Sequence, residues 1–399
     1  MARKTSKNAT DGRDAESPAP LQGFRLIRPL LHSLERLHGV GAERDRAGNR
    51  LLFYDQYLAL LLLYFFNPAI TSLRALQQAS DWDQTQKKLG IPRTSLGSLS
   101  EAAGVFDASF VEPILRELAQ QALPLTKGRE AEALAGLTAV DGSVFAALSR
   151  MAWALWKNDQ KRGLKLHLHF DVLKGVPRQA YITPAACSEV AELAETLEPQ
   201  RLYVLDRGYA CYSLFAKVLA AGSSLVARVK DNIAYTVQEE RTISPEAAQA
   251  GVVRDAILSR LGTPHHKDEL KRSMRLTVVR CRGERDGQEH EYWLITDRLN
   301  LDADLVALAY RKRWTVELFF RWLKCILGAR HLTSHSENGV QLQMYAAMIV
   351  SLLMALRTGC SPTKRTLEMI AFYLVGWVSD AEFDAHISKL QAASQKKKS

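Results

Sequence analysis

The spacing of hydrophobic and polar positions changes along this chain near residue 136. Before that point, apolar residues recur at helical spacing, which predicts helices over residues 21–37, 51–66, 72–80, 95–103 and 110–122. After it, short apolar runs predict strands over residues 137–141, 164–172, 178–183, 202–205 and 224–229, with helices over 189–197 and 212–221. Three adjacent strands followed by alternating strands and helices predict an α/β fold with a mixed sheet that helices cover.

Residues 232–290 interrupt this rhythm and predict a β-rich insertion. They are polar and include the first strand of a hairpin predicted over 275–282 and 291–296, with a turn at Asp286-Gly287. A long helix covers Tyr310–Lys324, and an amphipathic helix is expected over 341–357. The predicted organisation is a disordered tail (1–20), a helical region (21–125), a core (130–231 and 291–345), the insertion (232–290), C-terminal helices (346–390) and a disordered basic tail (391–399).

Charge and cysteine content indicate the kind of partner and the cellular compartment. The net charge of +10 and the pI near 9.3 suit a polyanionic partner, and residues 86–103 have a helix-turn-helix-like pattern. Five scattered cysteines argue against a disulfide framework and for a reducing compartment. The first twenty residues carry no apolar signal core, and the apolar run 57–66 is shorter than the ~20 residues of a membrane span. We therefore expect a cytoplasmic protein without a membrane segment.

One helical stretch carries a narrow polar ridge. At about 100° per residue, Tyr310, Arg313, Glu317 and Lys324 fall within an arc of about 60°. Two interpretations are open. Arg313 and Glu317 form an ordinary i, i+4 ion pair on a solvated face, or the cations line up along the repeating phosphates of a nucleic acid.

Three carboxylates are candidates for one site. Asp141 and Asp206 follow short apolar strands, and strand ends of α/β sheets converge on a common crevice. Glu317, on a helix after the sheet, supplies a third. Any single Asp at such a position is more often a turn or cap residue, but three convergent acids suit Mg²⁺, which prefers oxygen ligands. His167 and His169 are expected on the wetter face of their strand and are given no metal role.

The pattern Tyr-x₂-Arg-x₃-Glu-x₆-Lys resembles the signature around the last acid of bacterial DDE transposases of the insertion-sequence-four family. The resemblance extends to Val140-Asp141-Gly142-Ser143, Asp206-Arg207-Gly208-Tyr209 and the basic segment 225–232, in the family's order. It spans about residues 130–345, while the N-terminal helical region resembles the family more loosely.

The resemblance implies an RNase H-like core in which Asp141, Asp206 and Glu317 hold two Mg²⁺ ions, with Mn²⁺ as a substitute. It also implies a cut-and-paste transposase that acts on double-stranded transposon ends and target DNA, with a homodimer pairing two ends. Residues 21–125 would bind the ends. The residues implied to contact end DNA are Tyr310, Arg313, Lys324, Arg228 and Lys230, with Trp293 stacking on a flipped base. Two alternatives stay open: a domesticated or inactive relative that binds DNA without cutting, and a nuclease-like relative acting on RNA.

Overall fold

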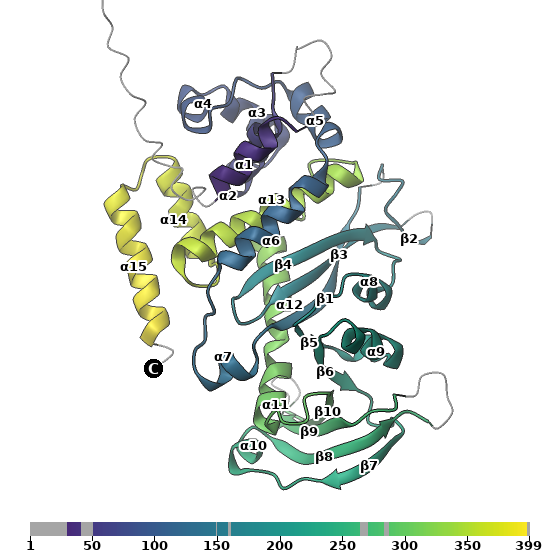
Figure 1. The fold of residues 1–399 in the computed structure, drawn as a ribbon. Coiled ribbons are helices and arrows are strands. Elements are labelled where there is room, and N and C mark those ends of the chain that lie inside the picture. The colour runs from purple at the N-terminus through teal and green to yellow at the C-terminus, as the bar shows by residue number, and fades with distance from the viewer. Residues whose placement is uncertain are drawn as a thin grey trace, which may run out of the picture.

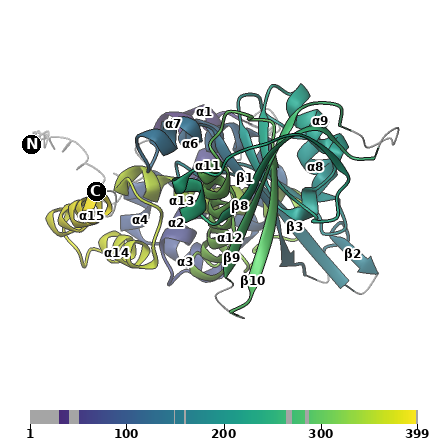
Figure 2. The same ribbon diagram turned by 90° about the horizontal axis from the view of Figure 1, so that it is seen from below.

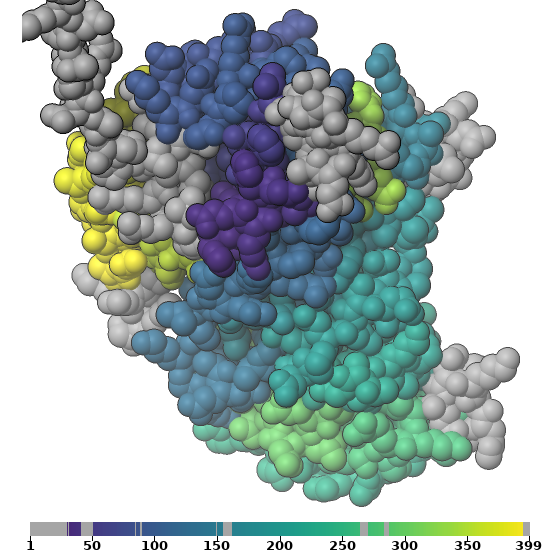
Figure 3. Space-filling model, turned by 45° about the horizontal axis from the view of Figure 1, so that its top comes forward, coloured from purple at the N-terminus to yellow at the C-terminus, as the bar shows by residue number. Residues whose placement is uncertain are grey.

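The computed structural model describes residues 30–40, 51–148, 150–158, 161–263, 270–282 and 287–396. The expectations for the tail 1–20, for residues 21–29 of the first helix, for the turn at Asp286 and for residues 397–399 lie outside these ranges. Helices from both ends of the chain gather at one end of the molecule, and the later strands form the other end (Figure 1). The space-filling view shows the same separation, with the N-terminal helices and the C-terminal helix α15 at one end (Figure 3).

Ten strands form one sheet in the order β2-β3-β1-β5-β6-β10-β9-β8-β7, with β4 paired to β3. Strands β1, β5 and β6 are parallel, and β3 is antiparallel to β1. The order β4-β3-β1-β5-β6 with these directions is an RNase H-like topology, so the predicted mixed α/β core is confirmed. The strands are β1 (Leu137–Ala146), β2 (Leu155–Asn158), β3 (Lys161–Asp171), β4 (Val176–Pro184), β5 (Leu202–Leu205), β6 (Ser224–Val229), β7 (Tyr235–Glu240), β8 (Val252–Leu261), β9 (Met274–Arg282) and β10 (Glu289–Thr296).

The helices cover both faces of this sheet. They are α1 (Leu31–His38), α2 (Tyr54–Phe66), α3 (Leu73–Ser80), α4 (Asp83–Leu89), α5 (Leu96–Val105), α6 (Glu112–Gln121), α7 (Arg129–Ala133), α8 (Glu189–Glu195), α9 (Tyr212–Ala220), α10 (Pro245–Gln249), α11 (Ala303–Lys312), α12 (Trp314–Arg321), α13 (Glu337–Thr358), α14 (Lys364–Leu374) and α15 (Asp380–Lys396). Seen from below, α8 and α9 lie on one side of the strands, and α12 and α13 lie on the other (Figure 2).

Successive strand residues feed two separate hydrophobic clusters, because side chains of a strand alternate between the faces of a sheet. Ala139 and Val204 belong to the cluster that contains residues of α11, α12 and α13. Val140 and Leu205 belong to the cluster that contains residues of α8 and α9. We call these the α12 face and the α8 face.

Two expectations for the first strands are wrong. The strand predicted to end at Asp141 continues to Ala146, because the eleven-residue β3 pairs with it as far as Gly163. His167 and His169 lie on no wet face: both are buried, and their rings bond to Thr183 at 2.8 Å and Thr196 at 3.2 Å. Both faces of this strand are covered by other parts of the fold, so alternating polar and apolar residues do not mark one solvent-exposed face.

The insertion does not form a separate sheet. β7, β8 and β9 pair in succession, β9 pairs with β10, and β10 pairs antiparallel with β6 of the core. The predicted hairpin strands therefore continue the core sheet, with three further elements (β7, α10 and β8) preceding them in the chain.

Helix α13 is a core helix and differs from the amphipathic helix expected over 341–357. It is long and apolar enough to cross a membrane by length and composition, but 89% of that apolar window is buried inside the fold. It packs against α2, α5 and α6 of the N-terminal region and against β4. Polar residues such as Gln343 and Ser351 are hydrogen-bonded within the fold, which allows their burial.

Two other helices depart from expectation. The stretch Tyr310–Lys324 is not one regular helix: α11 ends at Lys312, α12 begins at Trp314, and Trp322–Ile326 form a π-helix. At the end of the chain, α15 continues to Lys396, into the segment predicted as a disordered tail, because Gln391–Lys396 is rich in good helix formers.

Candidate functional site

Asp141 and Asp206 occupy equivalent positions on neighbouring parallel strands. The last register pair of β1 and β5 joins Ala139 to Val204, and each aspartate follows two residues later. By alternation both carboxylates leave the sheet on the α12 face, where Ala139 and Val204 lie. The sheet thus brings together the two acids that the sequence separates by 65 positions.

Asp206 connects the strand to helix α11. Its Oδ1 accepts a hydrogen bond from the backbone N–H of Arg207 at 2.7 Å and another from the Tyr310 hydroxyl at 3.0 Å. The guanidinium of Arg228, on β6, lies 3.9 Å from the same oxygen. The predicted residues Tyr310 and Arg228 are therefore both at the site, and both contact an acid.

Glu317 reaches the same region from α12, which packs against β1. Its Oε1 accepts a hydrogen bond from Arg313 at 2.6 Å, one helical turn earlier. Arg313 is only 9% exposed, and its charge acts on Asp141 and Asp206 as well. The guanidinium is thus a shared countercharge for the three predicted acids.

Lys324 contacts the strand of Asp141. The π-helix places its Nζ 2.6 Å from the carbonyl oxygen of Val144 and 4.4 Å from the ring centroid of Phe145. Burial lowers the pKa of Lys324, while Asp141 opposes that shift. The four residues predicted to share one helix face therefore do not stay together. Tyr310, Arg313 and Glu317 lie near Asp141 and Asp206, whereas Lys324 lies further along β1.

The two aspartates differ in their electrostatic environment. Burial raises the pKa of Asp141 to about 6, with Glu189 and Glu317 adding to the rise, while the Gly142 amide and Arg313 oppose it. Burial also acts to raise the pKa of Asp206, but the Arg207 amide, Arg313, Tyr310 and Arg228 outweigh it and lower that pKa. Of the two aspartates, Asp141 is therefore the one whose ionised carboxylate is less well stabilised by nearby positive charges and hydrogen-bond donors.

The donor set fits hard divalent cations. Asp141, Asp206 and Glu317 each use one carboxylate oxygen in a hydrogen bond, and the described residues supply no hydrogen bond to the other. Carboxylate oxygens are the preferred ligands of Mg²⁺. A bound cation would offset the burial, and to a lesser degree the neighbouring Glu189 and Glu317 charges, that raise the pKa of Asp141. Within the described ranges no three His, Cys, Asp or Glu side chains converge closely enough to hold one ion together.

A pocket of about 410 Å³ adjoins the acids. It is lined by Asp206, Arg228, Ala250, Val279, Cys281, Tyr292, Leu294, Ala307, Tyr310, Arg311, Arg313 and Trp314. The Tyr292 and Tyr310 rings lie 5.7 Å apart, and Arg228 stacks 4.4 Å above the Tyr292 ring. The pocket thus combines apolar walls and three aromatic residues with a group of charged side chains, which suits a flat, polar ligand.

The structure corrects the placement of Trp293. On β10, Tyr292 and Leu294 face the pocket, whereas Trp293 packs with Tyr235 in the cluster of the α8 face, at 6.0 Å between ring centroids. The aromatic residue of β10 that lines the pocket with Asp206 is therefore Tyr292, one position earlier. Lys230 follows β6 and is exposed, outside the pocket lining.

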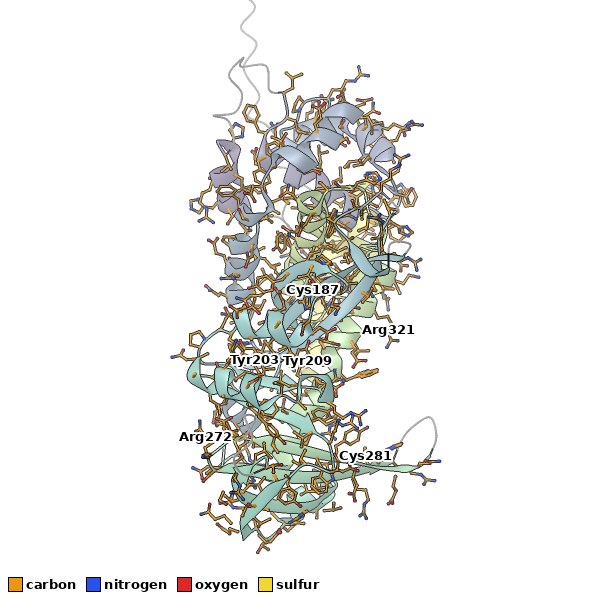
Figure 4. All side chains as sticks on the ribbon, turned by 90° about the vertical axis from the view of Figure 1, so that its right-hand side faces the viewer. Cys187, Tyr203, Tyr209, Arg272, Cys281 and Arg321 are labelled. Carbon is orange, nitrogen blue, oxygen red and sulfur yellow. The ribbon has the colours of Figure 1, made fainter. Side chains whose placement is uncertain are left out.

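Three residues near the acids escaped sequence reasoning. Trp314 lines the pocket and is half exposed. Glu189, the first residue of α8, packs against Gly142, and Tyr209 donates a hydrogen bond to it at 3.1 Å. In the side-chain view Tyr209 lies inside the fold, whereas Arg321, at the end of α12, projects from its edge (Figure 4). A glutamate at a helix start looks like an ordinary first-turn acid, so no sequence signal marks Glu189.

The part of the chain that contains the site matches a known protein family. Residues 132–353, which contain all three acids and the Tyr-Arg-Glu-Lys positions, match the family described as transposase DDE domain. The chain is similar to a putative transposase, y4zB, of Sinorhizobium fredii, with 29% identity over 243 residues, covering 60% of this chain and 65% of that protein.

Two further likenesses are more distant. A probable transposase for insertion sequence element IS5377 of Geobacillus stearothermophilus is 24% identical over 266 residues, covering 66% of this chain and 68% of that protein. A solved structure of the piggyBac transposase synaptic complex with hairpin DNA aligns with 10% identity and a TM-score of 0.39, covering 94% of this chain and 86% of that one.

Proposed function

The chain belongs to the transposase DDE domain family, and from that premise we propose that it is a DNA transposase that cuts transposon ends and transfers the strands into target DNA. The proposal is carried by one arrangement: Asp141 and Asp206 occupy equivalent positions on neighbouring parallel strands of an RNase H-like sheet, and Arg313, which pairs with Glu317, acts electrostatically on both aspartates. Its Tyr-Arg-Glu-Lys signature assigns it, within this proposal, to the insertion-sequence-four group.

Asp141, Asp206 and Glu317 would hold two divalent cations, Mg²⁺ or Mn²⁺ in its place. When bound, such ions activate water and stabilise the attacking and leaving oxygens of phosphoryl transfer. The acids are ligands in this scheme and not nucleophiles. The environment of Asp141 supports this role, because a carboxyl whose pKa is raised to about 6 gains more from a nearby cation than one already well paired.

The cations beside the acids are proposed to hold the DNA backbone. Arg313 and Arg228 lie on the pocket side of Asp206, and Lys324 lies along β1 beyond Asp141. The exposed Lys230 continues this series past β6. Positive groups at successive distances from a phosphoryl-transfer site suit a chain of phosphates, which fixes the register of the DNA without reading its sequence. Tyr310, which is hydrogen-bonded to Asp206, would contact the nucleotide nearest the cleaved bond.

The pocket is proposed to receive a base displaced from the end duplex. Enzymes that act on DNA commonly pay to unstack a nucleotide and recover part of that cost by stacking it on an aromatic ring. Tyr292 is placed for that role, next to Tyr310 and Arg228. This replaces Trp293, whose ring lies on the other face of β10.

The remaining assignments follow from the same proposal. Residues 21–125 would bind the transposon ends, with the pair α4 and α5, separated by the left-handed Gly90, as the candidate helix-turn-helix. Pairing two ends requires two catalytic sites, which favours a homodimer on DNA. We place this activity in the cytoplasm, at the nucleoid.

A cleavage assay tests the proposal against the non-cutting alternative. Supercoiled DNA carrying the ends of the element is incubated with the protein, with and without Mg²⁺, and nicked and linear products are measured. Cutting that needs Mg²⁺ and disappears in Asp141→Asn, Asp206→Asn and Glu317→Gln, while binding to the ends persists, supports the transposase. Binding without cutting by the unmodified protein would identify a domesticated DNA-binding relative instead, and normal cutting by one variant would remove that residue from the ligands.

A further inference from the structure

Glu189 is a fourth acid beside the proposed metal site, and both of its oxygens are engaged. Oε1 lies 3.1 Å from the ammonium of Lys165 on β3, and Oε2 accepts a hydrogen bond from the Tyr209 hydroxyl at 3.1 Å. The Lys165 side chain is largely buried, and it also donates to the carbonyl of Cys187, just before α8. The carboxylate is therefore held between Lys165 of strand β3 and Tyr209 of the short 3-10 turn after β5.

Glu189 meets strand β1 at the residue that follows Asp141. A Cβ atom added to Gly142 would lie 2.7 Å from Cδ of Glu189, closer than such atoms approach, so a side chain at this position would displace the Glu189 carboxylate. Because successive residues of a strand point to opposite faces, Glu189 approaches β1 from the α8 face, and the Asp141 side chain leaves on the α12 face. This arrangement places Glu189 behind the strand that carries Asp141.

The same carboxylate is joined to the segment of Asp206. Tyr209 follows Asp206 by three residues, in the short 3-10 turn Arg207–Tyr209 that Asp206 caps, and it is only 3% exposed. Glu189 thus contacts the residue after Asp141 and, through one buried hydrogen bond, the turn that begins at Asp206. No other carboxylate in the described ranges has both of these contacts.

We propose that Glu189 is a positioning residue that fixes the separation of Asp141 and Asp206 and thereby sets the affinity of the site for its divalent cation. The inference rests on the proposed function, since it assumes that these two aspartates are metal ligands. Groups that orient metal ligands typically change metal affinity by about 10- to 100-fold when they are removed. Direct ligation by Glu189 is the competing interpretation.

Mn²⁺ binding to the full-length protein without DNA, followed by electron paramagnetic resonance, tests this role. Tyr209→Phe removes one hydrogen bond and no charge, so it isolates the positioning effect. We expect Tyr209→Phe and Glu189→Ala each to raise the Mn²⁺ Kd about tenfold, and the double variant to bind no more weakly than Glu189→Ala alone. Glu198→Ala is the matched control: it breaks a 2.6 Å ion pair with Arg178 beyond the other end of α8 and should leave the Kd unchanged.

Each alternative outcome has one meaning. If Glu189→Ala weakens binding while Tyr209→Phe leaves it equal or tighter, Glu189 is a ligand and the positioning role is overturned. If both variants bind Mn²⁺ normally while Asp141→Asn loses binding, the positioning role alone is wrong. If Asp141→Asn also binds normally, the proposed metal site is wrong and this inference falls with it. Should Glu189→Ala fail to fold in melting curves, Tyr209→Phe decides by itself.

Discussion

Arg313 and Glu317 lie one helical turn apart and form an ion pair of 2.6 Å, with the Arg313 side chain almost fully buried. The ion pair expected as the simpler interpretation is therefore present, but it is not on a solvated face. The positive charge of Arg313 also acts on Asp141 and Asp206: it limits the rise in the pKa of Asp141 that burial causes, and it helps to lower the pKa of Asp206. A pair that looks like an ordinary helix-surface contact in the sequence is the electrostatic centre of the acid cluster.

Arg313→Ala should raise the pKa of Asp141 above about 6, because the guanidinium favours the ionised carboxylate and its removal leaves only the Gly142 amide to oppose burial and the Glu189 and Glu317 charges. Nuclear magnetic resonance of ¹³C-labelled aspartate, titrated in metal-free protein, measures the shift. Arg129→Ala is a suitable control, because that arginine pairs with Asp302 and Asp304 on the surface. An unchanged Asp141 titration in Arg313→Ala would mean that the two side chains do not interact.

The raised pKa of Asp141 predicts a pH-dependent cost to stability. Its pKa is about 6 in the folded protein and about 3.9 in the unfolded chain. Between these values the folded state binds more protons, so the free energy of unfolding of the metal-free protein falls as pH rises from about 4 through 6. Above pH 7, Asp141→Asn should therefore be more stable than the unmodified protein by about 3 kcal/mol.

Urea unfolding at pH 5 and pH 8 measures this effect. The advantage of Asp141→Asn should be smaller at pH 5, where the carboxyl is mostly protonated, and should vanish or reverse at pH 8 in saturating Mn²⁺, which stabilises only a site with its ligands intact. A stability difference that is the same at both pH values would show that Asp141 titrates normally in the fold.

The sequence predicts the core strands well where burial is complete and composition is uniform. β5 and β6 have the expected bounds because nearly every residue in them is apolar and a turn residue follows. β1 was expected to stop at Asp141, since a polar Asp-Gly-Ser looks like a turn. Its continuation depends on pairing with β3, which no local pattern reveals.

The candidate site is predictable in its acids and less so in its surroundings. Short apolar strands and helix spacing make Asp141, Asp206 and Glu317 candidates from local patterns alone, although β1 continues past Asp141. A helical wheel drawn at 100° per residue does not predict the π-helix that brings Lys324 to the Val144 carbonyl. The sequence also led to Trp293 instead of Tyr292, because neighbouring residues of β10 lie on opposite faces of the sheet. Glu189 depends on the packing of α8 against β1, a tertiary contact between distant segments.

Lys324→Ala should weaken binding to the transposon ends and reduce the slope of log K against log salt by about one unit, as expected when one phosphate contact is lost. The bond from its ammonium to the Val144 carbonyl gives it a second, structural role, so melting curves must accompany the titration. Lys324→Arg keeps the charge and should retain the slope. A drop in melting temperature with an unchanged slope would limit Lys324 to anchoring the π-helix.

The last prediction separates the two aromatic residues of β10. Tyr292 faces the pocket beside Asp206, and Trp293 packs on the opposite face against Tyr235. A displaced base stacked on an aromatic ring gains about 1–3 kcal/mol. Tyr292→Ala should therefore slow the step after first-strand nicking by roughly 10- to 100-fold, a factor obtained from that stacking energy at about 1.4 kcal/mol per tenfold, with little change in end binding.

Trp293→Ala should behave as a packing variant, with a melting temperature lower by several degrees and nicking and strand release reduced together, because a partly buried Trp leaves a cavity when truncated. Tyr292→Phe is the matched control: it keeps the ring that would stack and should recover most of the rate. Quenched time courses on a fluorescent end duplex resolve the two steps. If Trp293→Ala selectively blocks the second step while Tyr292→Ala does not, the displaced base stacks from the α8 face and the pocket beside Asp206 has another occupant.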